Sequence, residues 1–396
     1  MMACFDDPAA DLTTLPFGKA MRSLWRLASD VAYLNHGGFG ATPIPVLDAQ
    51  ARLRDRIEAA PGPFFTHDFP SLIRQAADRV AGRFGAAGDG LVFVDNATAG
   101  VNAVLASLRL APGDEVLITN ATYGGIRNAA AFATRRTGAR LVEATLPFPP
   151  PCPGAVVDAI GRCIGRRTRL AIVDHVVSEN GLVLPISDIV AGCRSQGVPV
   201  LVDGAHAPGH VAVDLAAIDA DWYTANLHKW AFAPRSCGIL WASAERRDGL
   251  HPAVISWGLD RGFAREFDWV GTRDPTPWLT APVGLELLDR LGFDRLAAHN
   301  HQLVMRAQAL LSARWDQAAV VVPDAMIGAM AVVPMPGRAA ATQQEADAER
   351  LRLWRDHRIE APIVLFGGRL WVRISAQIYN RLEDYERLAE AIPPSG

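Results

Sequence analysis

The stretch PVLVDGAHAPGHVAVDLAAIDADWYTANLHKWAFAP, residues 199–234, begins with an apolar run that ends at Asp203 and reaches a lysine, Lys229, 26 residues later. A continuous apolar run such as PVLVDG is typical of a strand buried on both faces of a parallel sheet. A carboxylate directly after such a strand is costly unless a cationic group or backbone N–H groups stabilise it. The stretch therefore predicts an α/β fold whose polar residues gather at the carboxyl edge of the sheet.

Lys229 is unusual because this chain uses arginine almost everywhere else. Among 39 Lys+Arg residues the only other lysine is Lys19. Arginine binds carboxylates and phosphates better, but only a lysine amine can lose its proton and attack a carbonyl group. Such an amine forms a Schiff base with a carbonyl substrate or with pyridoxal phosphate. The protonated pyridine nitrogen of that cofactor would also be a partner for Asp203, and His206 is close enough in sequence to join the same site.

The surrounding sequence repeats the strand pattern between residues 90 and 245. Short β-rich runs cover residues 91–95, 115–119, 140–144, 170–177, 199–204 and 238–242. Helical segments are expected between them near residues 98–109, 124–137, 154–164 and 186–196. Apolar strands that alternate with helices predict a mostly parallel sheet covered on both faces.

The pattern changes after residue 281. A long helical region is expected over 283–316, followed by the run AMIGAMAVVPM, a helix near 343–357 and the strand-like LWVRIS at 370–375. We predict a large domain of residues 30–281 and a smaller α+β domain formed by residues 1–29 and 282–396.

Composition excludes several classes of protein. The net charge is −3 without blocks of like charge, so a nucleic-acid partner is not expected. The five cysteines, at positions 4, 152, 163, 193 and 237, have no C-x-x-C spacing, and no H-E-x-x-H occurs. Neither a disulfide framework nor a metal site is therefore predicted. The first residues are acidic and no apolar run approaches the ~18 residues of a membrane span, so we expect a cytoplasmic protein with no membrane partner.

Two further strand ends carry candidate ligand-binding residues. The run 91–95 leads into NATAGVNAV, where Asn96 or Thr98 can cap a helix whose small first residues leave backbone N–H groups open to a phosphate. The run 115–119 leads into NATYGG, which places Tyr123 where it could stack on a flat ring. Taken alone, the first pattern more often marks an ordinary capped helix, and the second more often an ordinary half-buried tyrosine.

Together the motifs NATAGVNAV, TYGG, DGAHAPG and NLHKW resemble the class V aminotransferase group of fold-type I pyridoxal phosphate enzymes. The isopenicillin N epimerase-like subgroup also shares YLNHGGFGATP (33–43) and WVGTRDPT (269–276). The resemblance implies a mostly parallel seven-stranded sheet, a smaller α+β C-terminal domain, pyridoxal 5′-phosphate as cofactor and an amino-acid substrate. It also implies a homodimer with shared active sites.

The resemblance assigns a role to each matching position. It implies that Lys229 forms the Schiff base, that Asp203 pairs with the pyridinium nitrogen and that His206 lies by the ring hydroxyl. The other implied cofactor-binding residues are Tyr123 stacked on the ring, Ala97, Thr98 and His228 at the phosphate, Thr272 from the neighbouring subunit, and Ser178 and Asn180 in the loop after the fourth strand. The implied substrate-binding residues are Arg373 for the carboxylate, with His36 and Gly37 in an entrance loop.

Several reactions start from removal of the α-proton by the Lys229 amine. Related epimerase-like sequences tend to have Pro-Thr where this chain has Glu179-Asn180, which leaves the substrate open. Persulfide-forming desulfurases use a cysteine in the C-terminal third, and here none follows Cys237. We expect an amino-acid epimerase or racemase, with a class V aminotransferase or a desulfurase-like C–S lyase without a persulfide cysteine as the alternative. A catalytically inactive binding protein is a further alternative, and a nicotinamide enzyme is disfavoured because GGFG (37–40) lacks G-x-G-x-x-G spacing.

Overall fold

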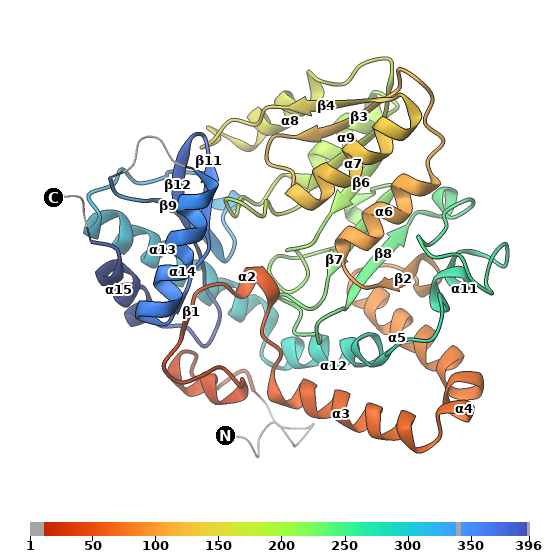
Figure 1. Cartoon of the computed structure of the whole chain (residues 1–396), viewed down its shortest axis with the longest axis horizontal. Coiled ribbons are helices and arrows are strands. Elements are labelled where there is room, and N and C mark those ends of the chain that lie inside the picture. Colours follow the sequence, from red (N-terminus) through yellow and green to blue (C-terminus); the bar gives the residue numbers. More distant parts are fainter. Residues whose placement is uncertain (1–11, 338–341, 394–396) are drawn as a thin grey trace.

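The computed structural model describes residues 12–337 and 342–393, and its largest element is a seven-stranded sheet (Figure 1). The strand order is β2-β8-β7-β6-β5-β3-β4. The bounds are β2 (Leu91–Val94), β3 (Glu115–Thr119), β4 (Arg140–Ala144), β5 (Thr168–Asp174), β6 (Val200–Asp203), β7 (Trp222–Asn226) and β8 (Gly238–Ala242). Every pair from β7 to β4 is parallel, whereas β8 is antiparallel to both β2 and β7. The predicted mostly parallel sheet of seven strands is confirmed.

Strand β7 is the one strand of this sheet that the apolar runs did not indicate. Its sequence, WYTAN, carries two polar residues that are nevertheless buried. The Thr224 hydroxyl donates to the Ile239 carbonyl at 2.9 Å, and the Asn226 side-chain oxygen accepts from the Ala97 N–H at 2.8 Å. Because these partners lie on other elements, the side chains of Thr224 and Asn226 are satisfied only in the folded protein.

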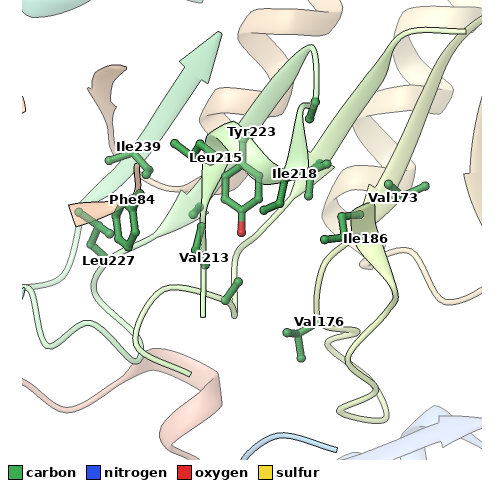
Figure 2. Close-up of a cluster of buried hydrophobic side chains, with 14 of the residues drawn as sticks. Phe84, Val173, Val176, Ile186, Val213, Leu215, Ile218, Tyr223, Leu227 and Ile239 are labelled. Atoms are coloured by element: carbon green, nitrogen blue, oxygen red, sulfur yellow. The ribbon is translucent and has the colours of Figure 1, made fainter. Parts of the chain in front are cut away.

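Helices cover both faces of this sheet. They are α5 (Phe69–Arg83), α6 (Ala97–Ser107), α7 (Gly124–Thr137), α8 (Pro153–Gly161), α9 (Ile186–Ser195), α10 (Leu215–Ile218), α11 (Phe263–Asp268) and α12 (Thr276–Arg290). Apolar residues of α6, α7 and α11 pack on one face, and those of α5, α8, α9 and α12 on the other, so successive residues of each strand alternate between two cores. Figure 2 shows part of the second core, where Tyr223 lies among Leu215, Ile218 and Val213.

The C-terminal part forms a smaller α+β unit beside the large sheet (Figure 1). Its elements are α13 (Phe293–Arg314), α14 (Gln343–His357), α15 (Leu382–Ala391), β9 (Met330–Pro334), β10 (Ile359–Glu360), β11 (Ile363–Phe366) and β12 (Arg369–Ser375). The antiparallel order is β11-β12-β9, while β1 (Ala32–Tyr33) pairs with β10 in parallel. The expected single helical region 283–316 is wrong in one respect: Gly292, at φ 78°, separates α12 from α13.

The N-terminal part links the two sheets. It contains the 3₁₀ helix η1 (Lys19–Leu24), α2 (His36–Phe39), α3 (Ile44–Ala59), α4 (Pro61–Pro63) and the π-helical turn η2 (Phe64–Asp68). Short 3₁₀ turns lie elsewhere in the chain, at η3 (Gly88–Gly90), η4 (Ala244–Arg246) and η5 (Asp324–Met326). Met21, Leu24 and Trp25 share a core with residues of α12 and α13. The division at residues 29 and 281 stays a prediction, and its first 11 residues lie outside those described. In the described ranges no helix has the length and apolarity needed to cross a membrane.

Candidate active site

The predicted site residues meet at the carboxyl edge of the large sheet. Asp203 is the last residue of β6 and pairs in register with Asp174, the last residue of β5. Lys229 lies in the turn that follows β7, and its Nζ atom lies 3.0 Å from Nε2 of His206. The fold thus brings together the acid, the histidine and the lysine of the stretch 199–234.

The surroundings of Lys229 disfavour the charged form of its amine. Burial, with a smaller contribution from the positive charge of Arg373, lowers the pKa of the Lys229 amine to about 7, although the nearby Asp203 opposes this change. A lysine with such a pKa carries a large fraction of uncharged amine at neutral pH. This is the form that attacks a carbonyl group and that accepts a proton.

His206 bridges the lysine to the loop after β5. Its Nε2 atom lies 3.3 Å from the Ser178 hydroxyl as well as 3.0 Å from Lys229 Nζ. Burial lowers the pKa of His206 well below its ordinary value, and neighbouring cationic groups, Lys229 among them, lower it further, so the ring is neutral. Its other nitrogen, Nδ1, is buried and has no hydrogen-bond partner among the described residues. An unpaired buried nitrogen at this position indicates that a ligand completes the site.

Asp203 and Asp174 form a buried pair of carboxyl groups. Asp203 accepts a hydrogen bond from the Ala205 N–H at 2.9 Å, but the described ion pairs do not include it. Burial raises the pKa of Asp203, and burial together with the charge of Asp203 raises that of Asp174 well above its ordinary value. Two neighbouring buried carboxyl groups with raised pKa values would be stabilised in their charged form by a cation bound at this edge of the sheet. Sequence reasoning missed Asp174 because the apolar run LAIVDHVV continues past it.

The predicted phosphate-binding residues lie where α6 begins. The Ala97 N–H, however, already donates to Asn226, so it is not a free donor. Asn96 caps the helix by accepting from the Ala99 N–H at 2.9 Å, which leaves Thr98 in the first turn. His228 donates from Nδ1 to the Cys237 carbonyl at 2.9 Å, and burial lowers its pKa to about 4. Its Nε2 is therefore the ring nitrogen left for a ligand.

Four other predicted cofactor contacts have different surroundings. Tyr123 starts α7 and is 48% exposed, so its ring is available for stacking. Thr272 is also exposed. Asn180 uses its side-chain oxygen to accept from the Leu182 N–H at 3.1 Å, which closes the turn rather than reaching a ligand. Ser178, in the same turn, is the residue whose side chain contacts His206.

Arg373 enters the site from β12 and is buried. Its Nη1 atom donates to the Ser178 carbonyl, its Nη2 donates to Asn35 Oδ1 at 3.0 Å, and its Nε has no hydrogen-bond partner within residues 12–337 and 342–393. Asn35 in turn donates to Glu360 Oε1 at 3.2 Å. Burial lowers the pKa of Arg373 to about 10, so the guanidinium stays charged at neutral pH. Asn35, which sequence reasoning missed, therefore connects a charged arginine to the N-terminal segment.

The predicted substrate contacts of His36 and Gly37 do not fit their positions. His36 has no exposed surface, and both of its ring nitrogens are bonded within the protein, to Tyr379 and to the Lys229 carbonyl. A Cβ atom at Gly37 would lie 2.6 Å from the Met330 sulfur. Both residues are packed beneath the lysine turn instead of facing an entrance.

The donor set fits pyridoxal phosphate. A buried carboxyl group outside the ion pairs of the described residues, a neutral histidine whose Nδ1 has no described partner and a lysine amine with a pKa lowered to about 7 lie near one another, as the pyridine nitrogen, the ring substituents and the aldehyde of that cofactor require. Among the described residues no cluster of His, Cys, Asp and Glu could hold a metal ion.

Comparison with known proteins agrees with this geometry. The family model for aminotransferase class V matches residues 33–388. The chain belongs to the class V aminotransferase family. The prediction of a pyridoxal-phosphate-dependent enzyme of this family, with the fold-type I architecture, is confirmed.

Relatives within the class V family carry different activities in their names. A putative L-cysteine desulfhydrase 1 of Oryza sativa subsp. japonica is 34% identical over 402 residues, covering 91% of this chain and 82% of the relative. An isopenicillin N epimerase of Amycolatopsis lactamdurans is 34% identical over 386 residues, covering 91% and 94%. The solved structure of the cystine C-S lyase C-DES with its product cysteine persulfide superposes with a TM-score of 0.78 at 22% identity, covering 93% and 99%, which supports the fold.

Proposed function

We propose that this protein acts at the α-carbon of an amino acid, with Lys229 as the residue that carries pyridoxal phosphate and exchanges the α-proton. The observation that supports this most directly is the Lys229 amine, whose pKa is lowered to about 7, at 3.0 Å from a neutral His206 and near the buried Asp203. When bound, the cofactor withdraws electrons from the α-carbon of the amino acid attached to it.

Each residue then has a distinct task. Arg373 binds the substrate carboxylate, since its guanidinium is charged and fixed by Asn35 and the Ser178 carbonyl. Asp203 keeps the pyridine nitrogen protonated, because a buried carboxylate is stabilised by a cation. Lys229 takes the α-proton as an amine, and His206 and Ser178 hold its Nζ in place at the sheet edge.

Epimerisation of an amino acid is the first candidate reaction. The relatives named isopenicillin N epimerase support it, although related epimerase-like sequences tend to have Pro-Thr where this chain has Glu179-Asn180. Epimerisation requires a second group that returns a proton to the face opposite the first. Burial raises the pKa of Glu179, while Arg127 and Arg373 oppose this change, so the carboxyl is poised nearer to neutral pH than an exposed glutamate.

Elimination across a C–S bond is the second candidate, because four relatives at 31–35% identity carry L-cysteine desulfhydrase in their names. A persulfide on the enzyme is not part of this proposal. Burial raises the pKa of Cys237, and raises that of Cys193 to about 11, so neither is a ready thiolate. The sulfur would therefore leave directly from the substrate.

Incubation with L- and D-amino acids in heavy water tests both candidates. Epimerisation predicts incorporation of deuterium at the α-carbon together with inversion of chirality, with no loss of amino acid. Elimination predicts a 2-oxo acid, ammonia and sulfide from L-cysteine. If Lys229→Ala retains a lysine-bound cofactor spectrum or α-proton exchange, the assignment of Lys229 is wrong.

We also propose a homodimer with shared sites and a cytoplasmic location. An exposed apolar segment supports the dimer: Val254, Ile255, Trp257 and Leu259 are 58%, 53%, 82% and 45% exposed. Such a patch is typical of a protein interface. The four described cysteines are all free, which suits a reducing compartment.

Mixed dimers test whether sites are shared. Lys229→Ala and Thr272→Glu each inactivate the homodimer if Thr272 reaches the phosphate of the neighbouring subunit, because a carboxylate there repels it. Mixed dimers of the two variants then contain one intact site and regain activity. No recovery after subunit exchange, with mixed dimers verified by mass, would reject sharing.

A further inference from the structure

The turn HGGFG, residues 36–40, packs directly against the backbone that carries Lys229. His36 has no exposed surface. Its Nε2 atom lies 2.9 Å from the Lys229 carbonyl oxygen, and its Nδ1 atom lies 2.8 Å from the Tyr379 hydroxyl. The ring therefore joins the lysine turn to a buried tyrosine of the C-terminal part.

The chemistry of these two contacts fixes the protonation of His36. A carbonyl oxygen can only accept, so Nε2 must carry the hydrogen. Burial lowers the pKa of His36 to about 3, so the ring is neutral and Nδ1 carries no hydrogen. The Tyr379 hydroxyl must then donate to Nδ1. One tautomer satisfies both partners, and it directs a single N–H at the backbone of the lysine.

The glycines of the same turn show how closely the two segments approach. Gly40 has φ 67°, and a Cβ atom there would lie 2.0 Å from the His228 carbonyl oxygen. A Cβ atom at Gly37 would lie 3.2 Å from the Trp230 ring. The Gly40 carbonyl accepts from the Tyr33 hydroxyl at 3.2 Å, which anchors the turn from its other side. The turn therefore contacts the backbone of residues 228 and 229 and the side chain of residue 230.

We propose that His36 is a positioning residue for Lys229, with Tyr379 as the group that sets its tautomer. The Nε2–H of His36 holds the Lys229 peptide carbonyl, which fixes the direction in which the lysine side chain leaves the backbone and hence the place of Nζ beside His206. This inference rests on the proposed role of Lys229 and explains the N-terminal motif, which the proposed chemistry does not otherwise use.

Substitutions that separate the N–H from the ring test the inference in the cofactor-loaded enzyme. His36→Leu removes both bonds, whereas His36→Gln keeps an N–H at about the place of Nε2. Tyr379→Phe removes only the donor to Nδ1. Tyr385→Phe is the matched control, because Tyr385 is equally buried and its hydroxyl donates to the Ser375 carbonyl at 2.8 Å rather than to His36.

Three measurements give the answer: the pH midpoint of the visible absorbance of the lysine-bound cofactor, the rate of cofactor loss, and kcat separately from KM. For His36→Leu we expect a displaced midpoint, cofactor loss about tenfold faster, and kcat about tenfold lower at similar KM, the effect of one or two lost buried hydrogen bonds. His36→Gln should recover most of this difference. Tyr379→Phe should lie between, and Tyr385→Phe should match the unsubstituted enzyme in all three.

Two results would overturn the inference. One is an unchanged midpoint and kcat in His36→Leu; the other is a His36→Gln variant as impaired as His36→Leu, which would show that ring packing matters and the bond does not. Should His36→Leu fail to fold, the comparison of His36→Gln and Tyr379→Phe with Tyr385→Phe decides. Lys229→Ala tells a failure of this inference from a failure of the proposed function. If the proposed role of Lys229 is wrong, the lysine-bound spectrum survives that substitution. If only the role of His36 is wrong, the spectrum is lost.

Discussion

Replacing Lys229 by Met should stabilise the cofactor-free protein while abolishing catalysis. Burial lowers the pKa of this amine from 10.5 to about 7 in the folded chain. The unfolded chain keeps the ordinary value, so between pH 7 and 10.5 it binds a proton that the folded chain has released. The sign follows directly: the stability of the unsubstituted protein rises with pH across this window, and the methionine variant lacks that dependence.

The magnitude follows from the same two values. One pH unit corresponds to about 1.4 kcal/mol, so below pH 7 the buried lysine costs the folded state about 5 kcal/mol. At pH 9 the remaining cost is about 2 kcal/mol, because the unfolded amine is closer to losing its own proton. Methionine has a similar length and no charge, and it avoids this cost at every pH.

Urea unfolding of both proteins after removal of the cofactor, at pH 6, 7, 8 and 9, measures this difference. Titrating groups distant from residue 229 cancel in this difference, whereas Asp203 and His206 contribute to it because their pKa values respond to the Lys229 charge. We expect a difference in the free energy of unfolding that is constant up to about pH 7 and then shrinks by about 1.4 kcal/mol per pH unit. A difference in the free energy of unfolding below about 1 kcal/mol, or one that does not vary with pH, would refute the reasoning that burial lowers the pKa of this amine.

Three further substitutions have defined outcomes. Asp203→Asn should still bind the cofactor but slow α-proton exchange, followed by NMR in heavy water, by about a hundredfold; equal rates would show that the carboxylate does not charge the ring. Arg373→Lys should raise KM for the amino acid about thirtyfold with a smaller change in kcat, because the planar fork is lost; an unchanged KM contradicts carboxylate binding. Gly40→Ala should lower stability to urea by more than about 2 kcal/mol, since its Cβ meets the His228 carbonyl at φ 67°; a neutral result would show that the turn can move away.

The large sheet could be predicted because most of its buried strands are continuous apolar runs that can be recognised in the sequence. EVLIT and GILWA became β3 and β8 with the expected bounds, and the helix over 343–357 begins at a capping threonine, Thr342. The strand WYTAN and the break at Gly292 were missed for opposite reasons. The first depends on polar partners supplied by other elements, and the second interrupts an apolar pattern that continues on both sides.

The candidate site divides in the same way. Lys229, Asp203 and His206 were predicted together because the single stretch 199–234 contains all three. The tasks of Asn35 and His36 could not be predicted, since their partners, Arg373 and Tyr379, lie more than 300 residues further along the chain. The place of Asp174 at the end of a strand could be predicted from the sequence. Its role could not, because it depends on Asp203, which lies opposite it on the neighbouring strand.

The pairing of β1 with β10 has a consequence for a chain that is made from one end to the other. Residues 32–33 find their hydrogen-bond partners only at residues 359–360. A ribosome adds roughly 5–20 residues each second, so the HGGFG turn emerges many seconds before the strand beside which it finally settles. The lysine segment at 228–230 is translated in between. The growing polypeptide consequently cannot complete the site until these last strands have been made. A product that ends before β10 lacks the pairing partner of β1, so the turn that contacts the Lys229 backbone is not anchored there.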